Sequence, residues 1–110
     1  MRRGTTPTIT LTVTNEDGTA CDLTEDSIYV TFHLSGAPST GDLTKRETDM
    51  TVETSDNATV LTIPLTQAET LAWTAGGTLE IQLRCKGSGI AQATNITNIP
   101  VERILLDGEI

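Results

Sequence analysis

The chain has 110 residues, enough for one domain with a single hydrophobic core. Fifteen acidic against seven basic residues give a net charge of −8, which argues against a nucleic-acid partner, because phosphate binding needs a clustered basic surface. No apolar run reaches the ~20 residues that span a bilayer, and no hydrophobic export segment follows Arg2-Arg3. We therefore expect neither a nucleic-acid nor a membrane partner, and synthesis in the cytoplasm.

Strict alternation of threonine with aliphatic residues marks the first predicted strand, Thr8–Thr14. A period of two, with β-branched side chains on both faces, is typical of a half-buried strand. Twenty-two of the 110 residues are threonine, and in this segment they take the outward positions. Pro7 favours an extended backbone before the strand, so residues 1–7 are predicted to form a polar N-terminal arm.

Further strands are predicted in the first half of the chain. Ile28–Leu34 alternates again, with Ile28, Val30, Phe32 and Leu34 on one face. Leu43–Met50 is weakly patterned and charged, which suits an edge strand protected from unwanted pairing. Thr51–Thr54 and Ala58–Leu65 are predicted to pair as a hairpin.

One short helix is predicted near residues 67–73. Thr66 and Glu69 form a capping box, in which each side chain satisfies a backbone N–H at the start of the helix. Gly76-Gly77 ends it.

The last strands complete the predicted fold. Thr78–Lys86 alternates well, and Ile90–Thr97 with Ile99–Leu106 supplies either one long bent strand or two short ones, because Pro100 forces a break or an edge position. Each strand is apolar on one face, so we expect an all-β, two-layer antiparallel sandwich of about seven strands. Its single domain spans residues 8–106, followed by a tail at 107–110.

No residue pattern indicates catalysis, a cofactor or a resident metal. His33 is the only histidine and lies on the polar face of its strand, where it is predicted to face solvent. Nothing matches a nucleophile elbow or a metalloprotease helix, so we expect no enzyme. Asn15–Gly18 with Asp22, Glu25 and Asp26 could supply oxygen ligands to calcium, but the EF-hand spacing is absent and solvated turns are the favoured interpretation.

The cysteines, the glycosylation sequons and the aromatic residues each leave two readings open. Cys85 continues an apolar face, so a buried reduced thiol is favoured over an inter-sheet bridge to Cys21. The sequons at Asn57 and Asn95 are attributed to the abundance of threonine. Trp73 with Tyr29 could form a sugar-stacking platform, but Trp73 is favoured as a plug at one end of the sandwich.

Four segments carry a resemblance. They are Arg3–Thr8, Leu65–Leu71, Leu79–Arg84 and Leu105–Ile110. Together they resemble a family of small proteins encoded in prophages of Gram-positive bacteria. The resemblance implies a phage structural protein of the tail or baseplate, built as an immunoglobulin-like sandwich, and it carries over no functional residues. Ala68 stands where an acidic residue is common in the family.

The predicted function is assembly into the virion, against other phage structural proteins or further copies of the chain. A homo-oligomer is expected in the particle. The termini are the first interface candidates, since ends without internal partners gain order on docking. A third candidate is the outward stripe of the strand Thr78–Lys86. The candidate residues are Gly4, Thr5, Thr6, Pro7, Thr8, Leu105, Leu106, Ile110, Glu80, Gln82 and Arg84. The alternatives are a carbohydrate- or cell-surface-binding module, a capsid decoration protein, and a small secreted adhesion domain.

Overall fold

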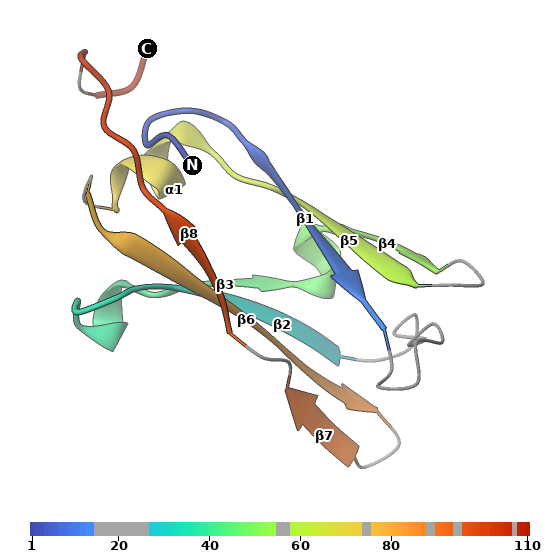
Figure 1. Ribbon diagram of the computed structural model, residues 1–110. Helices are drawn as coiled ribbons and strands as arrows, with labels where there is room; N and C mark the ends of the chain where they lie inside the picture. The colour runs from blue at the N-terminus through green and yellow to red at the C-terminus, as the bar shows by residue number, and fades with distance from the viewer. Residues whose placement is uncertain (15–26, 55–57, 74–75, 88–89, 94–95, 107) are drawn as a thin grey trace.

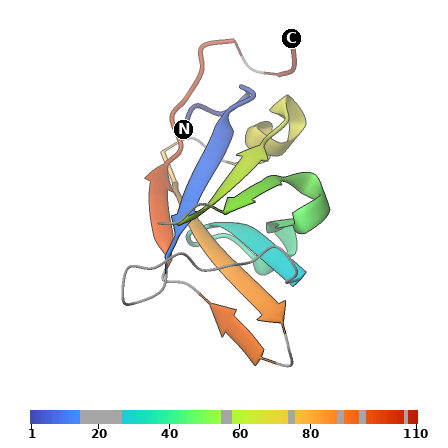
Figure 2. The same cartoon turned by 90° about the vertical axis from the view of Figure 1, so that its right-hand side faces the viewer.

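In a computed structural model, the described part of the chain forms eight strands in two antiparallel sheets that face each other (Figures 1 and 2). The structure describes residues 1–14, 27–54, 58–73, 76–87, 90–93, 96–106 and 108–110. The three-stranded sheet has the order β1 (Thr8–Val13), β5 (Thr59–Pro64), β4 (Thr51–Thr54). The five-stranded sheet runs β3 (Leu43–Arg46), β2 (Ser27–Leu34), β6 (Thr78–Gly87), and both β7 (Ile90–Ala93) and β8 (Thr97–Pro100) pair with β6.

The three-stranded sheet confirms the alternation expected of the first strand. Along β1 the threonines are exposed and Ile9, Leu11 and Val13 are half-buried against the core. The register pairs Ile9 with Ile63, so each aliphatic residue of β1 lies beside an inward residue of β5. The predicted hairpin is also present, because β4 pairs antiparallel with β5.

The five-stranded sheet is built on β6. The whole of β2 pairs along one side of it, from Ser27 opposite Lys86 to Leu34 opposite Leu79. On the other side, β8 covers the first half and β7 the second half. Two short strands are therefore present rather than one long bent strand. The expectation that the last strand continues to Leu106 is wrong, because β8 ends at Pro100, which cannot donate a ladder hydrogen bond.

The core lies between the sheets and draws on both. Its members are fully or almost fully buried: Ile28, Val30, Phe32, Leu61, Ile63, Leu65, Trp73, Leu79, Ile81, Leu83, Cys85 and Val101. A two-layer antiparallel sandwich is thus confirmed. The inward, buried position predicted for Cys85 is confirmed as well, whereas Cys21 lies outside the described residues.

A five-residue helix, α1 (Gln67–Leu71), covers one end of the sandwich, where both termini also lie (Figures 1 and 2). The predicted capping box is confirmed, since the Thr66 N–H donates to Glu69 Oε1 at 2.8 Å and the Glu69 N–H donates to Thr66 Oγ1 at 3.2 Å. The second carboxylate oxygen of Glu69 is 2.6 Å from Lys45 Nζ. Burial opposes ionisation of Glu69, but the hydrogen bonds from Lys45 and Thr66 outweigh it and lower the pKa of this carboxyl.

Replacing Glu69 with glutamine should separate the ion pair from the cap. Glutamine keeps the capping-box geometry but leaves the Lys45 ammonium, which is largely buried, without its counter-charge. We expect the free energy of unfolding to fall by about 1–2 kcal/mol at neutral pH. Because the pKa of Glu69 is lowered in the folded state, its contribution is present above the unfolded pKa and is lost as the pH falls through the folded pKa.

Urea unfolding between pH 7 and pH 3 measures this effect. The wild-type and Glu69→Gln curves of stability against pH should converge in acid. A constant gap between them would show that the carboxylate charge is not involved. Glu109→Gln, an exposed change of the same chemistry, is the matched control and should leave the curve unchanged.

Candidate functional site

The N-terminal arm lies along the chain that follows β8. The terminal ammonium of Met1 donates a hydrogen bond to the Pro100 carbonyl at 2.7 Å, and the Met1 carbonyl accepts one from the Glu102 N–H at 2.6 Å. The Arg3 N–H then donates to the Glu102 carbonyl at 3.1 Å, and Arg2 forms an ion pair with the Glu102 carboxylate at 2.9 Å. Arg2 and Glu102 thereby form a parallel β-bridge. The arm thus extends the edge of the five-stranded sheet before the chain crosses to β1 in the other sheet.

A second set of contacts holds the arm on α1. Thr70 is fully buried, and its Oγ1 accepts a hydrogen bond from the Gly4 N–H and donates to the Thr5 carbonyl, both at 2.9 Å. The Arg3 guanidinium donates to the carbonyl of Leu71, the last residue of the short helix, and to that of Trp73, just beyond it. These contacts satisfy backbone groups that a helix end otherwise leaves unpaired.

Glycine is required where the arm passes α1. Gly4 has a φ of +74°, in the left-handed region, and a Cβ there would lie 2.6 Å from Ile104 Cδ1. The prediction that Gly4–Thr8 lacks internal partners is therefore wrong. The sequence did not predict the contacts of Thr70 and Arg3 between the arm and α1. The one available signal was that Thr70 lies on a very short helix at a position suited to burial.

The C-terminal segment offers apolar side chains to solvent. Leu105, Leu106 and Ile110 are 92%, 72% and 91% exposed. The segment is attached to the fold by Ile104, which approaches Gly4, and by the Ile110 N–H, which donates to Gln67 Oε1 at 2.9 Å. Contact of these aliphatic side chains with water is unfavourable, and this unfavourable free energy is removed only when another surface covers them. Of the predicted candidates, this group best fits a docking element.

The stripe on β6 lies on the outer face of the five-stranded sheet, beside the outward residues of β2. Cross-strand neighbours are Glu80 with His33, Gln82 with Thr31, and Arg84 with Tyr29. His33 is not simply solvent-facing as predicted. It is half-buried, with Nδ1 2.6 Å from Asp42 Oδ1 and Nε2 3.9 Å from Glu80 Oε1. The hydrogen bond to Asp42 and the nearby Glu80 carboxylate give His33 a structural role on the outer face of this sheet.

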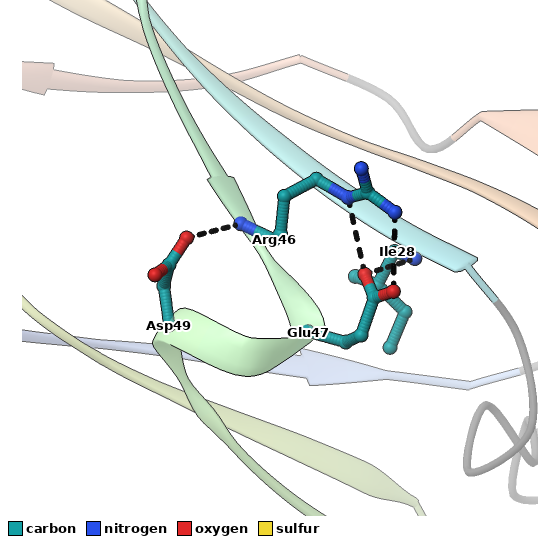
Figure 3. A network of polar contacts seen from close by, with 4 residues as sticks. All are labelled: Ile28, Arg46, Glu47 and Asp49. Carbon is teal, nitrogen blue, oxygen red and sulfur yellow. Dashed lines mark hydrogen bonds and ion pairs between the residues drawn. The ribbon is translucent and has the colours of Figure 1, made fainter.

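Figure 3 shows the polar network where β2 meets β3. Arg46 donates through two guanidinium nitrogens to both carboxylate oxygens of Glu47, at 3.2 and 3.1 Å, and its own N–H donates to Asp49 at 3.0 Å. Glu47 also accepts from the Ile28 N–H at 3.1 Å. Backbone N–H donors, its own and that of Ile28, followed by the Arg46 guanidinium, lower the pKa of Glu47. The Glu47 hydrogen bond raises the pKa of Arg46. The network fixes the 3₁₀ turn Glu47–Asp49 that ends β3.

The two aromatic residues proposed for a sugar platform differ in burial, as expected if Trp73 is a plug. Trp73 is 2% exposed and packs on Phe32 with ring centroids 5.8 Å apart, so the prediction of a buried plug is confirmed for it. Tyr29 is 38% exposed, and the Arg46 guanidinium carbon lies 4.0 Å from the centre of its ring. Trp73 and Tyr29 therefore do not form a common sugar-stacking platform.

A shallow hollow lies over Trp73, lined also by Leu34, Pro38 and Asp42. Its volume of about 150 Å³ is below the ~300–1,000 Å³ of a typical small-molecule site.

The remaining predictions concern ion and modification sites. Among the described residues, no three acidic, histidine or cysteine side chains are grouped so that they could hold a metal ion. The calcium candidates of residues 15–26 and the sequon residues Asn57 and Asn95 lie outside the described part of the chain. None of the helices described is both long and apolar enough to cross a membrane.

Comparison of the chain with protein-family models, with curated protein sequences and with solved structures finds no match.

Proposed function

We propose that this protein is a non-enzymatic structural component of a phage particle, of its tail or baseplate, which acts through protein–protein assembly. The observation that carries the proposal is the exposed aliphatic group of the C-terminal segment, Leu105, Leu106 and Ile110, attached beside an N-terminal arm that is already satisfied internally. A small acidic sandwich that exposes such an apolar segment is better suited to binding another protein surface than to enclosing a small ligand. The resemblance of four segments to prophage proteins supports the same class.

The location is tested on particles. The source prophage is induced, the particles are purified and immunogold electron microscopy locates the protein. Label at the tail or its tip is expected. Label over the capsid would favour the decoration alternative, and no label on intact particles, with the protein present in the lysate, would contradict the structural proposal.

The docking segment is tested by substitution. Leu105→Asp with Leu106→Asp should leave the melting temperature unchanged, because both side chains are largely exposed. Incorporation into particles should fall at least ten-fold, because two carboxylates would have to lose their hydration in an apolar contact. Quantitative immunoblotting of purified particles measures this, with Glu109→Gln in the same segment as the control. Unchanged incorporation would exclude the segment as the contact.

A carbohydrate- or cell-surface-binding module is the second candidate. Tyr29 supports it, because this aromatic ring is partly exposed, with Arg46 on it and Arg84 opposite it on β6. A partly exposed aromatic ring beside two guanidinium groups offers an apolar surface together with hydrogen-bond donors. Binding of the purified monomer to host cell walls, abolished by Tyr29→Ala, would favour this candidate over assembly.

A further inference from the structure

The strand β1 has an edge that no described strand covers. It is the outermost member of the order β1-β5-β4. The Leu65 N–H donates to the Pro7 carbonyl at 3.0 Å, which identifies Pro7 and Leu65 as a hydrogen-bonded pair in the β1–β5 register. Because such pairs alternate, Ile9, Leu11 and Val13 direct their backbone groups to β5. Those of Thr8, Thr10 and Thr12 point away, and no described residue bonds to them.

The other edges in the described part of the chain carry protective features that β1 lacks. On the edge strand β3, Lys45 lies on the core side and is held by Glu69, an inward charge of the kind that discourages pairing. β4 has four residues including Glu53, β7 has four residues, and β8 has four and ends in Pro100. β1 has six residues, all threonine, isoleucine, leucine or valine. A long uncharged edge of this composition is competent to accept another strand.

The inner face of β1 supports the same conclusion. Ile9, Leu11 and Val13 pack against the core but remain half-buried, whereas the corresponding residues of β5 are fully covered. A strand added beside β1 would cover this residual apolar surface and continue the core.

We propose that β1 pairs antiparallel with β1 of a second copy of this chain, about a twofold axis at Thr10. In this register Thr8 of one copy lies opposite Thr12 of the other, and Thr10 lies opposite Thr10. Each such pair exchanges two backbone hydrogen bonds, so all the outward groups of Thr8, Thr10 and Thr12 are satisfied. The two three-stranded sheets become one continuous six-stranded sheet.

The strand is complementary to itself, which favours a second copy over an unrelated peptide. Threonine meets threonine on the outer face, and Ile9 meets Leu11 on the inner face. No charge lies at the seam, so the −8 of each copy adds no close repulsion there. Pairing of like edges also closes after two copies, whereas pairing β1 with a different edge would continue into a fibre.

The first test is sedimentation equilibrium of the purified full chain from about 10 μM to about 1 mM, because a small interface of this kind is expected to be weak. The wild-type mass should approach twice 11.7 kDa over this range. Thr10→Lys should stay monomeric, because two ammonium groups would face each other at the axis. Thr62→Lys, on the neighbouring strand at the position paired with Thr10, should behave as wild type. A wild-type monomer at all concentrations, or Thr10→Lys association equal to wild type, would overturn the proposal.

The second test is cross-linking, which reads the register. Opposed residues in a hydrogen-bonded pair have Cα atoms about 5.5 Å apart, within disulfide range. Thr10→Cys should therefore form a covalent dimer under mild oxidation, well above the wild-type background from its own cysteines. Thr12→Cys, equally exposed on the same strand, would be about 14 Å from its counterpart and should not. Equal cross-linking of both variants, or none above background, would exclude this register.

The inference deepens the proposed function, since it rests on assembly as the mode of action, but the two fail separately. If the protein is a dimer in solution but no label is found on particles, only the virion proposal is refuted. Particle label with a protein that stays monomeric would refute only the β1 pairing.

Discussion

Trp73→Ala is expected to lower the free energy of unfolding by about 3–5 kcal/mol, the cost typical of deleting a large buried aromatic side chain. Trp73 is 2% exposed, belongs to the buried core and contacts Phe32 at a ring-centroid distance of 5.8 Å. Its removal leaves a void in this core. Urea unfolding followed by far-ultraviolet circular dichroism measures the change, because the variant has no tryptophan fluorescence.

Tyr29→Ala provides the matched control for this prediction. Tyr29 is the exposed aromatic residue, and its loss removes the contact with Arg46 but creates no cavity. We expect a cost of less than about 1 kcal/mol. If Trp73→Ala cost no more than Tyr29→Ala, the assignment of Trp73 as a plug would be wrong and a surface role for it would have to be reconsidered.

Thr70→Val is expected to destabilise the protein by about 2–4 kcal/mol. Valine has the same shape but no hydroxyl, so the Gly4 N–H and the Thr5 carbonyl lose their partner inside the protein. Each backbone polar group left unsatisfied costs about 1–3 kcal/mol. The arm should also loosen, so trypsin should cleave after Arg3 faster than in wild type under native conditions.

The control for this change is Thr70→Ser, which keeps the hydroxyl and removes only a methyl group. It should retain wild-type protection at Arg3 and cost less than about 1.5 kcal/mol. Equal trypsin sensitivity of the valine and serine variants would mean that the Thr70 hydrogen bonds do not hold the arm.

The strands were predictable because their signal is local. Alternation in Thr8–Thr14 and Thr78–Lys86 determines which side chains face inward. The capping box of Thr66 and Glu69 predicts the start of the helix from four consecutive residues. The sequence around Leu105 predicts a strand because its aliphatic residues resemble a buried run, but β8 ends at Pro100 and Leu105 is exposed. Nothing local distinguishes an apolar segment that completes its own sheet from one left on the surface.

The missed contacts are those between segments far apart along the chain. Arg3 meets Leu71 and Trp73, and Lys45 meets Glu69, across separations that leave no period or spacing to detect. Gly4 has a left-handed backbone in the turn at Arg3–Gly4, and this turn lies against Leu71 and Ile104, which come from distant parts of the chain. The position of the arm therefore follows only from the assembled fold.

The contacts of Met1–Arg3 with Pro100 and Glu102 also constrain the order of events during synthesis. These residues bond to partners about 100 positions further along the chain. On the ribosome the arm therefore cannot pair until the chain as far as Glu102 has left the exit tunnel. A nascent chain stalled with Glu102 still inside the tunnel should have an unpaired arm, and further elongation should order it.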